Sequence, residues 1–135
     1  MRARVGVLLL TVRDFPRMLA FYRDQVGFPL GKVHPGEGYR PLSDWARFEP
    51  NGPEGTALEL FDEKKHPRTF SPPFPRNNAV TIAFNVDDIK SAYEDLVRQG
   101  VEFTQPIGEQ EWGWYVHFRD PEGNLLQLYQ PRPGY

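Results

Sequence analysis

The sequence predicts an α+β fold made of two copies of a β-α-β-β-β unit, and an internal repeat is the main reason. Ten residues that start at Pro53 (PEGTALELFD) match ten that start at Pro121 (PEGNLLQLYQ), 68 positions later, with five identities. Two shorter matches lie upstream in the same order, residues 45–48 with 115–118 and residues 12–14 with 86–88. Because three matches share one order, we interpret them as a duplication.

Each unit opens with an apolar run, Val5–Val12 or Val80–Val86, which is typical of a buried strand. An aspartate then offers a carboxylate that can cap the first turn of a helix, Asp14 in one unit and Asp88 in the other. Apolar residues follow at helical spacing. They are Phe15, Met18, Leu19, Tyr22 and Val26 in the first unit, and Ile89, Ala92, Tyr93 and Leu96 in the second.

Glycines end both predicted helices, Gly27 in the first unit and Gly100 in the second. The last strands are expected at Ala57–Phe61 and Leu125–Tyr129. Between the first predicted helix and the strand at Ala57–Phe61, residues 31–44 contain five Gly or Pro residues, so a strand there must be short or interrupted. Residues 63–78 contain four prolines and predict an extended linker. We therefore expect one domain over residues 1–135, with module one at about 5–62 and module two at about 79–131.

Composition excludes several classes of function. The chain has no cysteine, which removes disulfides, thiolate catalysis and cysteine-type zinc sites. Its formal net charge is -2 without a basic patch, so nucleic acid is not an expected partner. Val5–Val12 follows two arginines like a signal peptide, but it is short and lacks a small-residue cleavage site. No run approaches the ~20 apolar residues that span a bilayer, so we expect no membrane partner and a cytoplasmic protein.

Three local patterns together resemble the vicinal-oxygen-chelate superfamily of glyoxalases, bleomycin-resistance proteins and extradiol dioxygenases. They are Val12-Arg13-Asp14 followed by Ala20-Phe21-Tyr22 and Gly27-Phe28; Val86-Asp87-Asp88 followed by a helix and Gly100-Val101; and Asp120-Pro121-Glu122-Gly123-Asn124 before Leu126-Gln127-Leu128. The resemblance implies two βαβββ modules that form an open, curved mixed sheet. Its helices would lie outside and a central cavity inside.

Metal-using members of this family place four inward residues, usually His or Glu, around one divalent ion. The resemblance carries these positions onto Val7, Glu59, Thr81 and Gln127. Only Glu59 is an ordinary ligand for a transition metal. His34 and His66 lie in predicted loops, from which either could complete an unusual site. We therefore expect no metal or other cofactor, with a lyase or dioxygenase on a non-standard metal site as one alternative.

Strand alternation and the family fold together predict which side chains face the cavity. Glu59 and Gln127 would point inward with Ala57, Phe61, Leu125 and Tyr129; on periodicity alone, Glu59 and Gln127 could instead face solvent. A four-residue turn at 120–123 would pair Val116 with Gln127 and turn His117 outward. The family places an inward residue three positions before Asp120, which would put His117 and Tyr115 inside and require a β-bulge.

We expect a protein that binds or sequesters a small organic ligand in an aromatic-lined cavity. The predicted ligand-binding residues are Trp45, Arg47, Phe61, Thr81, Tyr115, Gln127 and Tyr129, and Phe74, Trp112 and Trp114 could line the same cavity. An inward Arg47 would favour anionic ligands, and a negative cavity would favour cationic ones. The alternative is a metal-independent isomerase or lyase with Glu59 and His117 as acid and base. We also expect a homodimer, as is common among small members of the family.

Overall fold

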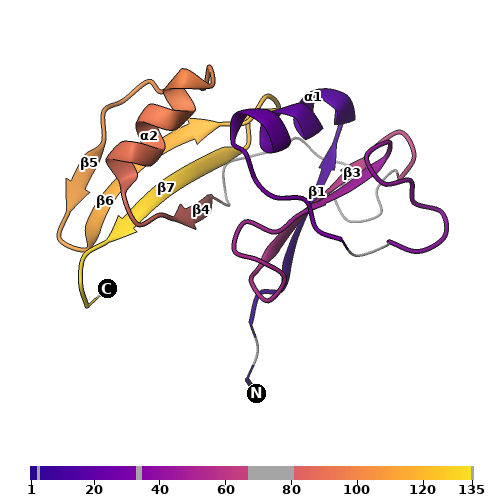
Figure 1. The fold of residues 1–135 in the computed structure, drawn as a ribbon, viewed down its shortest axis with the longest axis horizontal. Helices are drawn as coiled ribbons and strands as arrows, with labels where there is room; N and C mark the ends of the chain where they lie inside the picture. The colour runs from indigo at the N-terminus through magenta and orange to yellow at the C-terminus, as the bar shows by residue number, and fades with distance from the viewer. Residues whose placement is uncertain (3, 33–34, 67–80, 135) are drawn as a thin grey trace. The chain divides into compact units, whose positions relative to one another are not determined.

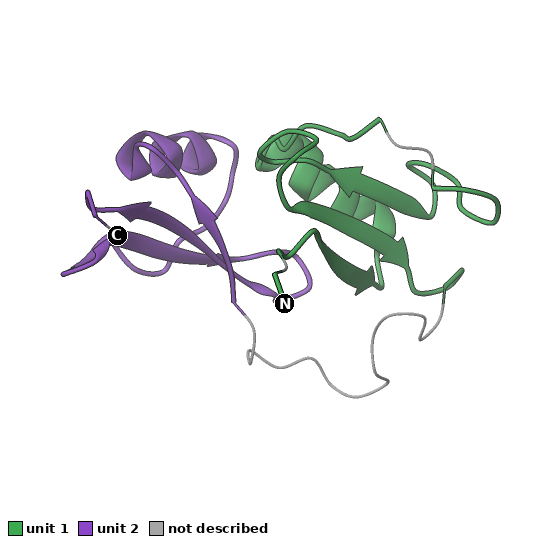
Figure 2. Cartoon of the chain, turned by 90° about the horizontal axis from the view of Figure 1, so that it is seen from below, with its two compact units in different colours: residues 1–74 green, residues 75–135 purple. Residues whose placement is uncertain are grey.

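The structure is a computed structural model that describes residues 1–2, 4–32, 35–66 and 81–134. The chain divides into two compact units, Met1–Phe74 and Pro75–Tyr135 (Figure 2). Each unit has its own sheet and its own helix (Figure 1). Most of the predicted linker lies outside the described residues, as do His34, Phe74 and Val80. None of the described helices is long and apolar enough to span a membrane.

Unit 1 contains a mixed sheet of three strands in the order β1-β3-β2. They are β1 (Val7–Val12), β2 (Trp45–Phe48) and β3 (Ala57–Asp62). β1 runs parallel to β3, and β2 runs antiparallel to it. Where a further strand was predicted, an isolated bridge joins Leu30 to Phe48. Residues 31–32 and 35–44, which the structure describes, form no strand, and their glycines and prolines explain this.

The helix of unit 1 begins at the predicted cap. The Asp14 carboxylate accepts the Arg17 backbone N–H at 3.2 Å, and α1 runs over Phe15–Ala20. It then continues as one π-helical turn, η1 (Phe21–Gln25), where the spacing had predicted a regular helix. The wider turn contains two consecutive buried aromatic side chains, Phe21 and Tyr22. In a regular α-helix, with 3.6 residues per turn, two consecutive side chains do not lie on one narrow face.

The helix covers one face of the sheet of unit 1. The ring of Tyr22 lies 5.9 Å from that of Phe48, between centroids, and both side chains are fully buried. Phe48 pairs with Leu58 in the sheet, so these residues and Leu60 form the covered face. Glu59, which lies between the two leucines, points to the opposite side. We call that side the helix-free face of unit 1.

Unit 2 contains the complete β-α-β-β-β order in a mixed sheet of four strands, β4-β7-β6-β5. Its elements are β4 (Ile82–Asn85), α2 (Ile89–Arg98), β5 (Gly108–Gln110), β6 (Gly113–Arg119) and β7 (Leu125–Pro131). The Asp88 carboxylate caps α2 by accepting the Ser91 N–H at 3.1 Å. The Ile89 N–H donates to the Gln130 side-chain oxygen at 2.8 Å, so α2 lies on the Gln130 face of the sheet (Figure 1).

The register of the two sheets repeats the duplication seen in the sequence. In unit 1, Glu59 pairs with Leu9 on one side and with Arg47 on the other. In unit 2, Gln127 pairs with Ala83 and His117 in the same way. Each row belongs to the face opposite the helix of its unit. The predicted α+β fold of two related modules is therefore confirmed.

Candidate functional site

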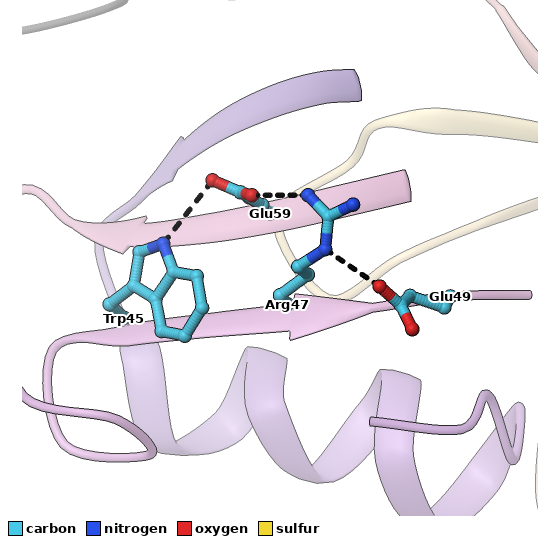
Figure 3. A network of polar contacts seen from close by, with 4 residues as sticks. All are labelled: Trp45, Arg47, Glu49 and Glu59. Carbon is cyan, nitrogen blue, oxygen red and sulfur yellow. Dashed lines mark hydrogen bonds and ion pairs between the residues drawn. The ribbon is translucent and has the colours of Figure 1, made fainter. Parts of the chain in front are cut away.

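A network of polar side chains lies on the helix-free face of unit 1 (Figure 3). Trp45 and Arg47 project from β2 and Glu59 projects from β3, all on the side away from the helix. Glu49, just past the end of β2, points to the same side. Alternation along the strands explains this grouping, because residues two apart share a face.

Both oxygens of Glu59 have partners within this network. Arg47 Nη1 donates to Glu59 Oε2 at 2.7 Å, and the Trp45 indole N–H donates to Oε1 at 3.3 Å. Arg47 Nε donates to Glu49 Oε2 at 2.9 Å. The side chains of Arg47, Glu49 and Glu59 are only 17%, 10% and 16% exposed. Hydrogen bonds from Arg47 to Glu49, and then to Glu59, raise the pKa of Arg47, so the guanidinium keeps its charge. It forms ion pairs with both carboxylates.

Glu49 was not among the predicted site residues. The signal that could have found it was the alternation of residues 45, 47 and 49, followed one residue past the strand. Gly31 supports the same contact, because a Cβ at this position would lie 2.9 Å from Glu49 Cδ and 3.2 Å from Arg47 Cδ. The Gly31 N–H also donates to the Arg47 carbonyl at 2.8 Å. A residue without a side chain therefore lies directly against the ion pair.

A hollow of about 240 Å³ lies beside this network, within unit 1. Its walls come from Leu30–Lys32, from Pro41 and Leu42, and from Trp45–Arg47 of β2. Ligand pockets for drug-sized molecules usually hold roughly 300–1,000 Å³. The hollow on its own therefore accommodates a substituent of such a molecule and not the whole of it.

On the helix-free face of unit 2, His117 and Gln127 are direct partners. Their Nε2 atoms are 3.1 Å apart, so the amide can donate to a neutral imidazole. His117 shares the face of Gln127, and the turn has the geometry of the predicted bulge. The Gly123 N–H donates to the Asp120 carbonyl at 2.9 Å, the Asp120 N–H donates to the Asn124 carbonyl at 3.1 Å, and Gly123 has a left-handed φ of 84°. Arg119 pairs with Leu125, which leaves five loop residues where the sequence suggested a turn of four. The extra residue shifts the pairing by one position and brings His117 opposite Gln127.

Aromatic rings cover the other end of this face. The Trp112 ring lies 5.3 Å from Tyr115 and 5.2 Å from Tyr129, between centroids. The Tyr129 hydroxyl donates to the Trp112 carbonyl at 3.2 Å. The ring of Tyr115 lies over Gly108, where a Cβ would come within 2.7 Å of it. The Tyr115 and His117 rings are also in contact, with centroids 5.6 Å apart.

Three further candidates have different surroundings. Trp114 lies on the opposite face from Tyr115, where its indole donates to Glu109 at 3.1 Å and Arg132 stacks on it, so it does not share the Trp112 cluster. Thr81 immediately precedes β4 and is exposed. Phe61 is 3% exposed and contacts Tyr39 and His66. Glu59 and His117 belong to different units, so the prediction that they share one cavity stays a prediction.

The donors at the family's four metal positions do not fit a transition metal. Val7 has no donor atom in its side chain, and Thr81 and Gln127 provide only neutral groups. The one carboxylate, Glu59, already accepts bonds from Arg47 and Trp45. Among the described residues, no cluster of three or more His, Asp or Glu side chains could hold an ion.

Residues 4–128 match the family model of the glyoxalase/bleomycin resistance protein/dioxygenase superfamily. The chain belongs to this superfamily. The resemblance drawn from the repeat and the motifs is thereby confirmed. Individual relatives and solved structures are similar to this chain over nearly its whole length.

The Bacillus subtilis (strain 168) protein YetH is 30% identical over 125 residues, which cover 93% of this chain and 96% of YetH. Among solved structures, TnmS3, an antibiotic binding protein from Streptomyces sp. CB03234, is 28% identical with a TM-score of 0.73. That match covers 97% of this chain and 98% of TnmS3. A glyoxalase/bleomycin resistance protein/dioxygenase from Nocardioides is 26% identical with the same TM-score, covering 100% of this chain and 87% of the other.

Proposed function

We propose that this protein binds a small organic ligand without using a tightly bound transition metal. The observation that carries the proposal is the engagement of Glu59, the one carboxylate at the family's metal positions, by Arg47 and Trp45. A carboxylate held in this way is oriented as a hydrogen-bond acceptor and is a poor metal ligand. The similarity to TnmS3, an antibiotic binding protein, supports a binding role.

The charge of the unit 1 network favours cationic or hydrogen-bond-donating ligands. Arg47 alone would attract anions, but it is paired with both Glu49 and Glu59. One guanidinium and two carboxylates leave a net charge of -1, and the low exposure of the three side chains limits screening by water. An anionic ligand would have to displace one of these carboxylates from Arg47.

The Trp112, Tyr115 and Tyr129 rings support an aromatic ligand in unit 2. Aromatic side chains offer large apolar faces to planar molecules, and hydroxyl and amide groups at their edges fix orientation. Here the Gln127 amide and the His117 imidazole lie next to the rings. The cluster of unit 2 therefore favours planar aromatic molecules. The network of unit 1 separately favours cationic groups, so we test probes that are both planar and charged.

A panel of planar probes tests this proposal by thermal shift and isothermal titration calorimetry. Proflavine represents an aromatic cation and anthraquinone-2-sulfonate an aromatic anion of similar size. A ligand at 100 times its dissociation constant adds about 2.7 kcal/mol of stability. We expect proflavine to stabilise the protein, and Glu59→Gln to weaken that binding roughly tenfold, as expected for a loss of about 1.4 kcal/mol. Preference for the sulfonate, or equal binding by the variant, would contradict the charge argument.

Elemental analysis tests the metal argument separately. We expect no stoichiometric zinc, nickel, manganese or iron in protein dialysed after purification. Retention of one such ion per chain would contradict the proposal and would favour the alternative of a non-standard metal site. In that case Glu59→Gln should release the ion, because Glu59 is the one carboxylate that these positions offer.

The catalytic alternative needs Glu59 as a free base and His117 as its partner. The ion pair with Arg47 disfavours that role, because the Glu59 carboxylate would have to break its bond with Arg47 before it accepts a proton. We therefore place binding ahead of isomerase or lyase chemistry. Dimerisation and a cytoplasmic location remain predictions from the sequence.

A further inference from the structure

The loop over residues 39–44 lies immediately before β2, and several contacts hold it against the start of that strand. The Arg40 carbonyl accepts N–H groups from Ser43 and Asp44 at 3.0 Å and from Trp45 at 3.3 Å. Leu42 has a φ of 65°, a left-handed conformation that is costly for a residue other than glycine. The loop leads directly into Trp45, whose indole donates to Glu59. Its shape therefore determines where the Trp45 indole lies.

A buried pair joins this loop to a turn that is distant in sequence. His66 Nε2 lies 3.2 Å from Asp44 Oδ1, and the two side chains are only 11% and 8% exposed. The same Asp44 oxygen accepts the Arg40 backbone N–H at 2.8 Å. One carboxylate oxygen thus closes the loop and at the same time ties it to the end of the turn that follows β3.

Aromatic rings enclose the His66 imidazole. It stacks on Tyr39 with centroids 4.6 Å apart and an interplanar angle of 27°. The ring of Phe61 meets it edge-on at 6.1 Å. Phe61 pairs with Trp45 in the sheet, so the enclosed imidazole lies next to the row that carries the indole. This arrangement gives His66 two routes of contact with Trp45, through Asp44 and through Phe61.

The polar groups around His66 come from two segments. Among the described residues, the titratable groups on the loop are Tyr39, Arg40 and Asp44, and those on the turn before His66 are Asp62, Glu63, Lys64 and Lys65. Asp62 Oδ1 accepts the backbone N–H of residue 64 at 3.0 Å. Burial raises the pKa of Asp44, but bonds from the Arg40 N–H and His66 outweigh it and lower this pKa overall. At neutral pH the partner of His66 is therefore an ionised carboxylate.

We propose that His66 and Asp44 are a positioning pair, through which gain or loss of a proton on His66 changes the hydrogen bond between Trp45 and Glu59. A protonated imidazole forms an ion pair with Asp44 and holds the loop firmly. A neutral imidazole can still donate one N–H to the ionised carboxylate, but without the positive charge on the ring this contact is weaker. Neither residue needs to touch a ligand, and the proposal does not depend on the function proposed above.

Nuclear magnetic resonance of the full chain tests this pair without any ligand. The Trp45 indole N–H signal is assigned by its loss in Trp45→Phe and followed between pH 5.5 and 8, the range in which imidazoles titrate. In the unmodified protein we expect it to shift with the same midpoint as the His66 ring signals. His66→Gln can still donate to Asp44 but cannot titrate, so the indole signal should remain and lose its pH dependence.

Asp62→Asn serves as the matched control, because it removes a carboxylate from the same turn without touching the pair. The indole titration should persist in this variant and disappear in Asp44→Asn. A persistent titration in His66→Gln would overturn the proposal. If that variant does not fold, different midpoints for the His66 ring and the Trp45 indole in the unmodified protein would overturn it equally.

Discussion

The two sheets place different chemistry on equivalent positions. In unit 1 the row Leu9–Glu59–Arg47 contains an ion pair, extended by Glu49 and by the Trp45 indole. In unit 2 the corresponding row Ala83–Gln127–His117 contains an amide hydrogen-bonded to an imidazole and adjoins an aromatic cluster. Because the pairing is the same in both, the backbone does not impose either chemistry. The difference teaches that the helix-free faces diverged while the register stayed fixed.

Removal of the central cation should break this comparison most clearly. Arg47→Met leaves Glu49 and Glu59 without their shared partner in a poorly hydrated place. Loss of one member of a buried pair costs about 3–5 kcal/mol, and partial exposure reduces this to roughly 2–3 kcal/mol here. Chemical denaturation measures the change.

His117→Met is the matched control for Arg47→Met, because it makes the same replacement at the equivalent position of unit 2. It breaks one contact with Gln127 and should cost only about 1 kcal/mol. If Arg47→Met and His117→Met lowered the free energy of unfolding equally, the view that the Glu59 and Gln127 rows differ in charge, and not merely in shape, would be contradicted.

A methyl group at Gly31 should disturb unit 1 by a smaller amount. The added Cβ would lie 2.9 Å from Glu49 Cδ, so the carboxylate must move away from Arg47. We expect Gly31→Ala to lower the free energy of unfolding by about 1–2 kcal/mol, as overpacking does. Gly6→Ala is the control, because a Cβ there meets no atom within 4 Å and should cost little. An unchanged stability in Gly31→Ala would mean that Glu49 can leave the network freely.

The stability of unit 1 at acidic pH tests how far its polar contacts depend on charge. The bonds to Asp44 lower its pKa, so they stabilise the folded protein above the ordinary carboxyl pKa of about 3.9. This contribution is lost as the pH falls through the lowered folded value. Asp44→Asn should therefore be less stable than the unmodified protein at pH 7 by about 1–2 kcal/mol.

The difference between Asp44→Asn and the unmodified protein should shrink as the pH falls below 4. Denaturation at several pH values measures it, and Asp87→Asn, at an exposed carboxylate of unit 2, provides the control. A difference that is independent of pH would show that Asp44 acts by shape and not by charge.

The smallest expected effect lies in the aromatic cluster of unit 2. Tyr129→Phe removes the hydroxyl that donates to the Trp112 carbonyl at 3.2 Å. This should cost about 0.5–1 kcal/mol, since it is one neutral hydrogen bond at a half-exposed place. Tyr93→Phe on α2 is a matched control, and both variants can be compared by thermal denaturation. A loss as large as that of Arg47→Met would mean that unit 2 depends on polar bonds as much as unit 1 does.

Much of this architecture follows from the sequence alone. The repeat of Pro53–Leu60 at Pro121–Leu128 places Glu59 and Gln127 on equivalent rows, and alternation assigns their faces. Asp14 and Asp88 predict the starts of both helices, because an acceptor is needed where the first N–H groups have no partner. These features are local or periodic, and for that reason a single sequence reveals them.

Other features depend on contacts that have no period. His66 and Asp44 are 22 positions apart, and nothing in either segment indicates that they meet. The five-residue loop before Leu125 sets the register of His117, and one residue of loop length cannot be read from composition. That Arg47 is neutralised by Glu49 as well as Glu59 depends on rotamers, so the sequence left open whether its face attracts anions or cations.

The division of each sheet into a helix-covered side and a helix-free side has a consequence for evolvability. Substitutions at Leu58 or Leu60 must preserve the packing against the helix. Their neighbour Glu59 does not contact the helix and is constrained instead by its bonds with Trp45 and Arg47. Every second residue of a strand can thus mutate under a separate set of selection pressures. A combinatorial library restricted to the helix-free positions could therefore explore new specificities while the packing that folds each unit stays intact.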